Sequence, residues 1–309
     1  MVETWDDLLG ELIDESEFKS SIEENGFYKS DTSLKVFARK YNFQPLQNTA
    51  TYLSIDFWSK QSNVLRRNNF FLLRIGGGKF GIFDQKKFPK PYLDLSTKNS
   101  IKLDLERDED FKDLIEAFDT RQENAGLEHL NVTGVYDSLI TELFGKKKWH
   151  IGPRGNKVSE FKVFGKTTQK EIIPLYDFDG QEELDYTIWT KEHILLIEAK
   201  SLETNSGLDI GWHKISYPAS RFKKYTNRKI IPIYLLKWQN ITHLFVFPIF
   251  NFHNDKGIIV NDKEKVAIIT PDVDIIPGSQ TLNPAYIVFS NYEKILKWNR
   301  SVKCFNSVR

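Results

Sequence analysis

The first third of the chain shows helical spacing of apolar residues, followed by two short apolar runs around a glycine-rich turn. Apolar residues recur every three or four positions over 5–24 and over 34–41, and a third helix is predicted over 55–67. Residues 70–83 predict a β-hairpin around three consecutive glycines. Three helices followed by a hairpin is the order of a winged helix, whose third helix reads the major groove. An ordinary small α+β domain or another DNA-binding fold would give a similar pattern.

A segment with prolines and then serines, 88–100, separates this part from the rest of the chain. Beyond it we expect an acidic helix over 104–122 and another helix over 133–144. A later helix over 209–217 is expected to end before Pro218. The predicted strands of this part cover residues 160–164, 171–176, 184–189, 194–197, 230–238 and 241–250.

This order of elements predicts a mixed α/β (α+β) fold in which helices flank a central sheet. We expect an N-terminal, winged-helix-like DNA-recognition domain at 1–97. A connecting acidic helix would follow at 98–124, and a second domain would occupy 125–309.

Charged residues interrupt the most apolar pair of predicted strands. A hairpin that turns symmetrically about Lys191 and Glu192 places Asp185 directly opposite Glu198, with their Cβ atoms about 5 Å apart. Lys200 then lies on the same face, two residues further along. Carboxylates on an otherwise apolar strand are costly to bury unless they have a partner, and a divalent cation is one such partner.

Asp185 followed by Glu198-Ala199-Lys200 resembles the core motif of the PD-(D/E)xK nuclease superfamily, and in particular of type II restriction endonucleases. Leu184 stands where the motif name has proline. The resemblance implies that residues 125–309 form a nuclease domain that hydrolyses double-stranded DNA. It further implies that Asp185 and Glu198 hold Mg²⁺, for which Mn²⁺ would substitute, and that Lys200 lies near the attacking water.

Members of this family often add an acidic residue from the helix before the sheet. Asp137 is our preferred candidate for this further metal ligand, because apolar residues surround it on the predicted helix. Glu142 on the same helix and Glu183 beside Asp185 remain alternatives.

The formal net charge of +1 conceals three stretches without any acidic residue, at 57–83, 143–159 and 210–254. This segregation is expected if one side of the protein meets a polyanion, although solvated surface charges would also account for it. The candidate DNA-binding residues are Lys60, Gln61, Asn63, Arg66 and Arg67 on the third helix, Arg154 and Lys157 in a loop, and His213 and Lys214 after the motif.

The sequence and the resemblance together predict a sequence-specific restriction endonuclease. Cutting both strands implies a homodimer, and a cognate DNA methyltransferase would be encoded separately. A structure-directed repair or mobile-element nuclease, and a non-catalytic DNA-binding regulator on a nuclease scaffold, are the alternatives. The single cysteine excludes an internal disulfide, and no apolar stretch is long enough to span a membrane, so we expect a cytoplasmic location.

Overall fold

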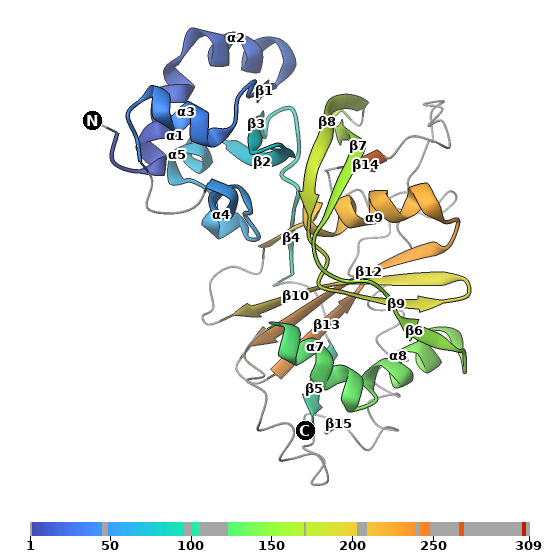
Figure 1. The fold of residues 1–309 in the computed structure, drawn as a ribbon. Coiled ribbons are helices and arrows are strands. Elements are labelled where there is room, and N and C mark those ends of the chain that lie inside the picture. Colours follow the sequence, from blue (N-terminus) through green and yellow to red (C-terminus); the bar gives the residue numbers. More distant parts are fainter. Residues whose placement is uncertain are drawn as a thin grey trace.

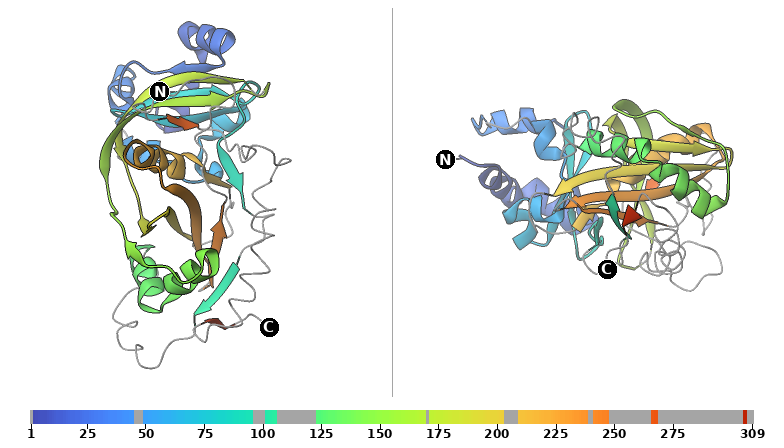
Figure 2. Two further views of the ribbon diagram at one scale, coloured as in Figure 1. Left: turned by 90° about the vertical axis from the view of Figure 1, so that its right-hand side faces the viewer. Right: turned by 90° about the horizontal axis from the view of Figure 1, so that it is seen from below.

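The structure is a computed structural model, and the chain is a mixed α/β protein with two larger mixed sheets and a small two-stranded one. Figures 1 and 2 show the arrangement of its elements. The structure describes residues 2–44, 49–95, 101–105, 123–169, 171–202, 209–238, 241–247, 266–268 and 305–306.

The N-terminal helical segment is divided where the sequence predicted one helix. Helices α1 (Trp5–Asp14) and α2 (Ser16–Asn25) meet at Glu15, whose backbone is extended. The Glu15 carboxylate accepts hydrogen bonds from Lys40 (2.7 Å) and from the Tyr41 hydroxyl, which ties the junction to the end of the next helix. The prediction of a continuous helix over 5–24 was therefore wrong at one residue.

The other N-terminal elements agree with the sequence in part. Helix α3 (Leu34–Lys40) and the hairpin of β2 (Phe70–Gly76) and β3 (Lys79–Asp84) confirm the predicted elements. The prediction of a third helix over 55–67 was wrong. An isolated bridge from Phe57 to Ile210 holds the start of that segment in an extended conformation. Only two short helical pieces follow, η1 (Trp58–Lys60) and α5 (Asn63–Arg67). Helix α4 (Thr49–Leu53) precedes them.

The first sheet joins the N-terminal hairpin to strands from much later in the chain. Its order is β1-β3-β2-β8-β7-β14, with β1 (Phe27–Lys29), β7 (Lys157–Lys166), β8 (Ile172–Glu182) and β14 (Val266–Ile268). Strands β2 and β8 run parallel and meet at Gly76 and Asp179. Gly76 has a φ of +100°, and a Cβ there would collide with the Asp179 backbone, so glycine permits this junction.

The second sheet has the order β15-β5-β13-β12-β10-β9-β6. Strand β10 (His193–Leu202) is central, antiparallel to β9 (Tyr186–Thr190) and parallel to β12 (Lys229–Trp238). The outer strands are β6 (Trp149–Ile151), β13 (Ile241–Val246), β5 (Ile101–Leu105) and β15 (Phe305–Asn306). The strands predicted in this part are confirmed, except that residues 248–250 lie outside the described residues.

Helices cover both faces of the second sheet (Figure 1). Helices α7 (Glu123–Val132) and α8 (Val135–Phe144) pack on one face, and α9 (His213–Tyr225) lies on the other. Helix α8 confirms the helix predicted over 133–144. The end predicted before Pro218 was wrong. Pro218 lies in the second turn of α9, where proline removes a single intrahelical hydrogen bond.

The segment before α7 differs from the predicted acidic helix where it is described. Residues 101–105 form β5, which pairs with β13. The rest of that predicted helix, 106–122, lies outside the described residues. Helix α7, which begins at Glu123, was not predicted as an element of its own.

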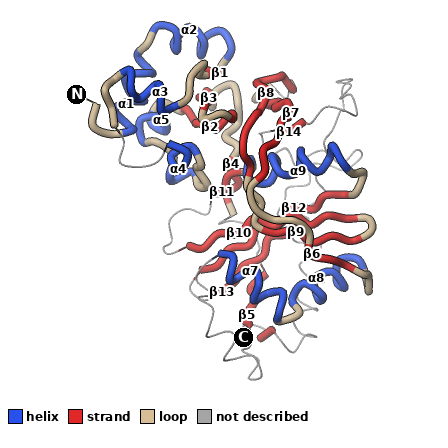
Figure 3. The backbone as a smooth tube through the Cα atoms, in the orientation of Figure 1, coloured by secondary structure: helices blue, strands red, loops and turns tan. Residues whose placement is uncertain are grey.

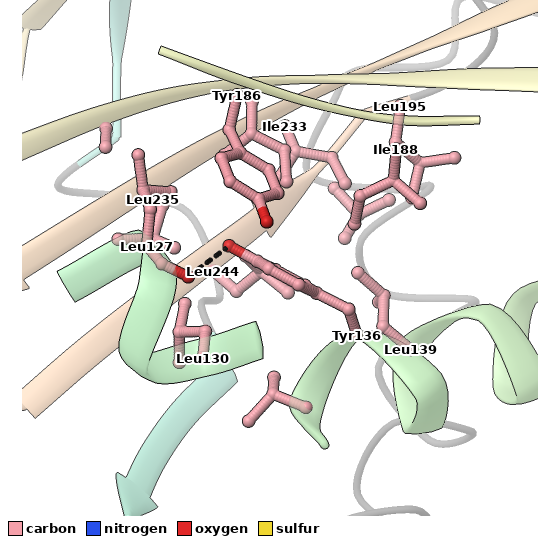
Figure 4. Close-up of a cluster of buried hydrophobic side chains, with 14 of the residues drawn as sticks. Leu127, Leu130, Tyr136, Leu139, Tyr186, Ile188, Leu195, Ile233, Leu235 and Leu244 are labelled. Carbon is pink, nitrogen blue, oxygen red and sulfur yellow. Dashed lines mark hydrogen bonds between the residues drawn. The ribbon is translucent and has the colours of Figure 1, made fainter. Parts of the chain in front are cut away.

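Figure 4 shows the core between α7, α8 and the second sheet. The Tyr136 ring enters this core and its hydroxyl donates to the carbonyl of Leu127 at 3.2 Å, while the ring stacks on Tyr186 with centroids 5.3 Å apart. The polar tip of the ring is thus satisfied by a backbone carbonyl in the middle of α7. This contact fixes α7 against α8 and so positions the N-terminal end of α7 relative to the sheet.

A small third sheet links the N-terminal part to the start of α9 (Figure 3). It consists of β4 (Tyr92–Asp94) and β11 (Asp209–Gly211), which pair antiparallel. The amide of Gly211 also donates to the carbonyl of Asp56 at 2.8 Å. Residues 54–57 are thereby held beside the first turn of α9.

Candidate active site

Strands β9 and β10 pair in the register that the sequence predicted. Ile194 lies opposite Trp189 and Ile197 opposite Tyr186, so one further step along the ladder brings Glu198 opposite Asp185. Asp185 precedes β9, and its Oδ2 accepts a hydrogen bond of 2.8 Å from the amide of Ala199. Asp185 is therefore held against the strand that carries the other two motif residues.

The pleat of β10 determines which way its side chains point. Leu195, Ile197 and Ala199 face the core under α7 and α8. Glu198 and Lys200 alternate with these residues, so they point to the opposite face, on which α9 lies. Both are buried, with 5% and 9% of their surface exposed.

Lys200 is surrounded by carboxylates. Its Nζ lies 3.0 Å from Glu198 Oε1, 3.8 Å from Asp185 Oδ2 and 3.6 Å from Glu123 Oε2. Burial disfavours the ammonium, but these negative charges outweigh that effect and hold the pKa of Lys200 well above its ordinary value. The three predicted catalytic residues thus form one cluster in which Lys200 stays protonated.

Glu123 supplies the acid from the helix before the sheet, and Asp137 does not. Glu123 is the first residue of α7, and its Oε1 also accepts from the amide of Ser201 at 3.1 Å. Asp137 is exposed and accepts from Trp149 Nε1 at 2.6 Å, which ties α8 to β6 away from the cluster. Our preference for Asp137 is corrected, because its side chain is directed to a tryptophan.

The two alternatives to Asp137 do not join the cluster either. Glu183 is exposed and lines a cavity of about 240 Å³ beside Lys214. The side chain of Glu142 lies outside the described part of the structure. Glu123 was missed because the residues around it show little helical periodicity and only the packing of α7 brings its first turn to the sheet.

A second charged pair, which sequence reasoning also missed, lies next to the cluster. Lys214 Nζ on α9 lies 2.6 Å from Asp56 Oδ1 and donates to Ser54 Oγ at 2.8 Å. Burial raises the pKa of Asp56, but Lys214 and then Lys200 outweigh it, and the net pKa is lowered. The lysine of this pair was predicted as a phosphate contact, whereas Asp56 comes from the segment predicted as a helix.

Glu198 is the electrostatically least favourable group of the cluster. Burial raises its pKa from an ordinary 4.5 to about 8, Lys200 partly opposes this, and the charge of Asp185 adds to it. Even without the charge of Glu198, the carboxylates of Asp185, Glu123 and Asp56 outnumber the two ammonium groups of Lys200 and Lys214. This local excess of negative charge would favour a cation.

The donor set suits a hard divalent cation such as Mg²⁺, because it consists of carboxylate oxygens on neighbouring elements. Within the described residues, no three acidic, histidine or cysteine side chains already converge on one point, since the Lys200 ammonium lies among the carboxylates. A cation near Asp185 and Glu198 would stabilise the charged form of Glu198 that burial disfavours. By donor chemistry and charge, these residues fit the metal that the motif implies.

His213 is largely buried and lines the cavity that also contains Lys214. Its ring is buried between Tyr92 and Tyr217, with ring centroids 6.1 Å and 5.9 Å away. Burial and the charge of Lys214 lower its pKa to about 3, so the ring is neutral at physiological pH. A neutral ring offers no positive charge to a phosphate, and a DNA contact of His213 stays a prediction.

Gln61 is a structural residue. It is 2% exposed, and its amide nitrogen donates to the Leu72 carbonyl at 2.8 Å and to the Tyr92 hydroxyl at 2.7 Å. Its oxygen accepts from the Leu72 amide at 3.2 Å. Because both ends of the amide are used inside the protein, Gln61 cannot read a base edge.

The other predicted DNA-binding residues lie at or near the surface. Lys60 and Arg67 are exposed, and Asn63 accepts a hydrogen bond from Arg66. Arg154 forms an ion pair with Glu128, and Lys157 Nζ lies 5.9 Å from the centroid of the Tyr225 ring. Their DNA contacts stay predictions.

The fold and the site define a mixed α/β protein with a buried cluster of carboxylates and one lysine on its central strand. Residues 89–265, which are more than half of the chain, match a domain of unknown function (DUF6997), and the chain belongs to that family. No curated protein and no solved structure matches the chain. No described helix is long and apolar enough to span a membrane.

Proposed function

We propose that the protein is a Mg²⁺-dependent endonuclease with a PD-(D/E)xK core that hydrolyses double-stranded DNA, as type II restriction endonucleases do. The observation that supports this most is the convergence of Asp185, Glu198 and Lys200 on one face of a central strand. A scaffold without chemistry has no need of such buried charges, because burying them costs free energy.

The side chains divide the chemistry between them. Asp185 and Glu198 would hold the metal, with Glu123 as a third carboxylate at the same edge. The metal, when bound, supplies Lewis acidity to the scissile phosphate and lowers the pKa of an attacking water. Lys200 remains protonated, so it orients the nucleophile and stabilises negative charge on the phosphate oxygens, and does not act as a base.

DNA would approach from the side of the cavity that contains Lys214 and Arg74. Lys214 and Arg74 line the cavity beside the cluster and are suited to backbone phosphates. The surface residues Lys60, Asn63 and Arg67 remain candidates for recognition by the N-terminal part. Cutting both strands at a specific sequence would use a homodimer, and the host DNA would be protected by a separate methyltransferase.

The test is incubation of the protein with unmethylated phage DNA in Mg²⁺ and in EDTA, with Glu198→Gln as the inactive variant. Glu192→Gln is the matched control, because it makes the same change at an exposed position of the same hairpin. Discrete fragments that require Mg²⁺ and Glu198 would support a sequence-specific enzyme. A smear would favour a structure-directed or nonspecific nuclease, and intact DNA with a mobility shift would favour a non-catalytic DNA-binding regulator.

A further inference from the structure

A second hollow lies at the other end of α9 from Lys214. It has a volume of about 520 Å³, within the range of roughly 300–1,000 Å³ that is usual for ligand pockets. Its walls are the loop at 153–157, the ends of β9 and β10 next to their turn, and the last turn of α9 with the residues after it. None of the residues proposed for catalysis lines it.

Cations line this pocket, and no acidic side chain among its described lining residues accompanies them. Arg221 is committed to Glu182 at 2.9 Å, and Arg154 to Glu128. Among the residues that the structure describes, Lys157 forms no ion pair with a carboxylate, and Arg228 donates from its Nε to the Lys191 carbonyl at 3.2 Å. Lys157 and Arg228 are therefore the cations suited to an anionic ligand.

Aromatic rings lie directly beside these two cations. Lys157 Nζ is 5.9 Å from the centroid of Tyr225, and Arg228 Cζ is 5.8 Å from that of Trp189. Tyr225 is 66% exposed, so its ring is accessible from the solvent side of the pocket. Pairs of aromatic rings and cations are the arrangement that accepts a nucleobase together with its phosphate.

Trp189 forms part of the pocket wall and is held in place by the neighbouring loop. Its indole Nε1 is buried and has no hydrogen-bond partner among the described residues, which leaves a donor unsatisfied. Gly152 allows the loop to lie against this ring, because a Cβ there would collide with the indole and with the Thr187 hydroxyl. Gly152 therefore lies against the Nε1 edge of the indole, and Trp189 also lines the pocket.

We infer that this pocket binds a single unstacked nucleotide, with the base against Trp189 and Tyr225 and the phosphate between Lys157 and Arg228. Asn156 lines both this pocket and the cavity that contains Lys214, so a strand could follow α9 from one to the other. If the bound nucleotide belongs to the DNA substrate, the inference rests on the proposed function. A free nucleotide has the same chemistry and is the alternative occupant of the pocket.

The test measures binding in EDTA, where no cleavage occurs. The probes are deoxythymidine monophosphate, a fluorescein-labelled twelve-residue oligothymidylate, and a blunt duplex with one 2-aminopurine. Tyr225→Ala should weaken binding of the oligonucleotide by roughly 5- to 150-fold, from about 1–3 kcal/mol per stacked base. Arg228→Gln should weaken binding of the monophosphate as well as of the oligonucleotide. Tyr225→Phe keeps the aromatic ring and should bind the oligonucleotide as the wild type does. Arg39→Gln, at an exposed position of α3, is the charge-matched control.

The outcomes distinguish a nucleotide of DNA from a free nucleotide, and they test the pocket separately from the proposed nuclease activity. A rise in 2-aminopurine emission with the duplex, lost in Tyr225→Ala, identifies a displaced nucleotide of DNA. Monophosphate binding without any oligonucleotide or duplex binding identifies a free nucleotide. Unchanged binding of all three probes in folded Tyr225→Ala and Arg228→Gln would overturn the pocket even if the protein cleaves DNA. Binding that depends on the pocket residues, without cleavage of DNA in Mg²⁺, would overturn only the proposal of nuclease activity.

Discussion

Replacing Glu198 by glutamine should stabilise the metal-free protein at alkaline pH while it abolishes cleavage. The carboxyl is 5% exposed, and burial raises its pKa from 4.5 to about 8. Between these two values the folded chain keeps a proton that the unfolded chain has lost. Because the folded state binds more protons, the free energy of unfolding falls as the pH rises through this interval, and the contribution of Glu198 is fully lost above pH 8.

The size of this effect follows from the interval. Each unit of pKa difference corresponds to about 1.4 kcal/mol, which sets a ceiling of about 5 kcal/mol between pH 4.5 and pH 8. Relaxation around the ammonium of Lys200, 3.0 Å from Glu198, reduces this ceiling, and we expect roughly 2–4 kcal/mol. Mg²⁺ should remove most of the difference in the wild type, because the cation favours the charged carboxylate.

The assay is urea unfolding in EDTA at pH 5 and pH 8, followed by the fluorescence of the seven tryptophans. The wild type should lose about 2–4 kcal/mol more than Glu198→Gln between these conditions. Glu192→Gln, at the exposed end of the same hairpin, should behave as the wild type. Equal losses of unfolding free energy in the wild type and Glu198→Gln would refute the reasoning, because burial of the charged Glu198 carboxylate would then cost no stability.

Three further predictions concern the surroundings of the site. Arg221→Met leaves buried Glu182 without its arginine, which lies 2.9 Å away, and should cost about 3–5 kcal/mol by urea unfolding. The pKa of His213 is about 3, so stability should fall as the pH drops below its ordinary 6.5, and the fall should be smaller in His213→Gln; identical acid titrations would contradict this. Mg²⁺ should raise the melting temperature of the wild type but not of Asp185→Asn.

The hairpin that carries Asp185, Glu198 and Lys200 could be predicted from the sequence because the residues that determine its register lie within it. Apolar residues on both sides of a four-residue polar turn leave few symmetric registers, and a slip of one residue would turn every side chain to the other face. The position of Glu198 opposite Asp185 follows from that constraint alone. Helix α3 and the hairpin of β2 and β3 were predictable for the same reason, since their signals lie within each segment.

The remaining site residues depend on contacts between segments far apart in the chain. Glu123 and Asp56 reach the cluster only because α7 packs on the sheet and residues 54–57 lie along β11. Gln61 has the composition of a DNA-reading residue, but the nearby backbone of Leu72 and the Tyr92 hydroxyl use its amide. Such tertiary partners override the local pattern, and no spacing within the chain indicates them.

The pairing of Lys214 with Asp56 has a consequence for protein engineering. The N-terminal part donates a carboxylate beside the cluster, and its hairpin shares a sheet with β7 and β8. Exchanging this part for that of another protein, as is done with modular nucleases, would remove a partner of Lys214 and expose a sheet edge. In the proposed nuclease, changes of specificity would therefore be better sought by redesign of surface side chains than by exchange of the N-terminal part.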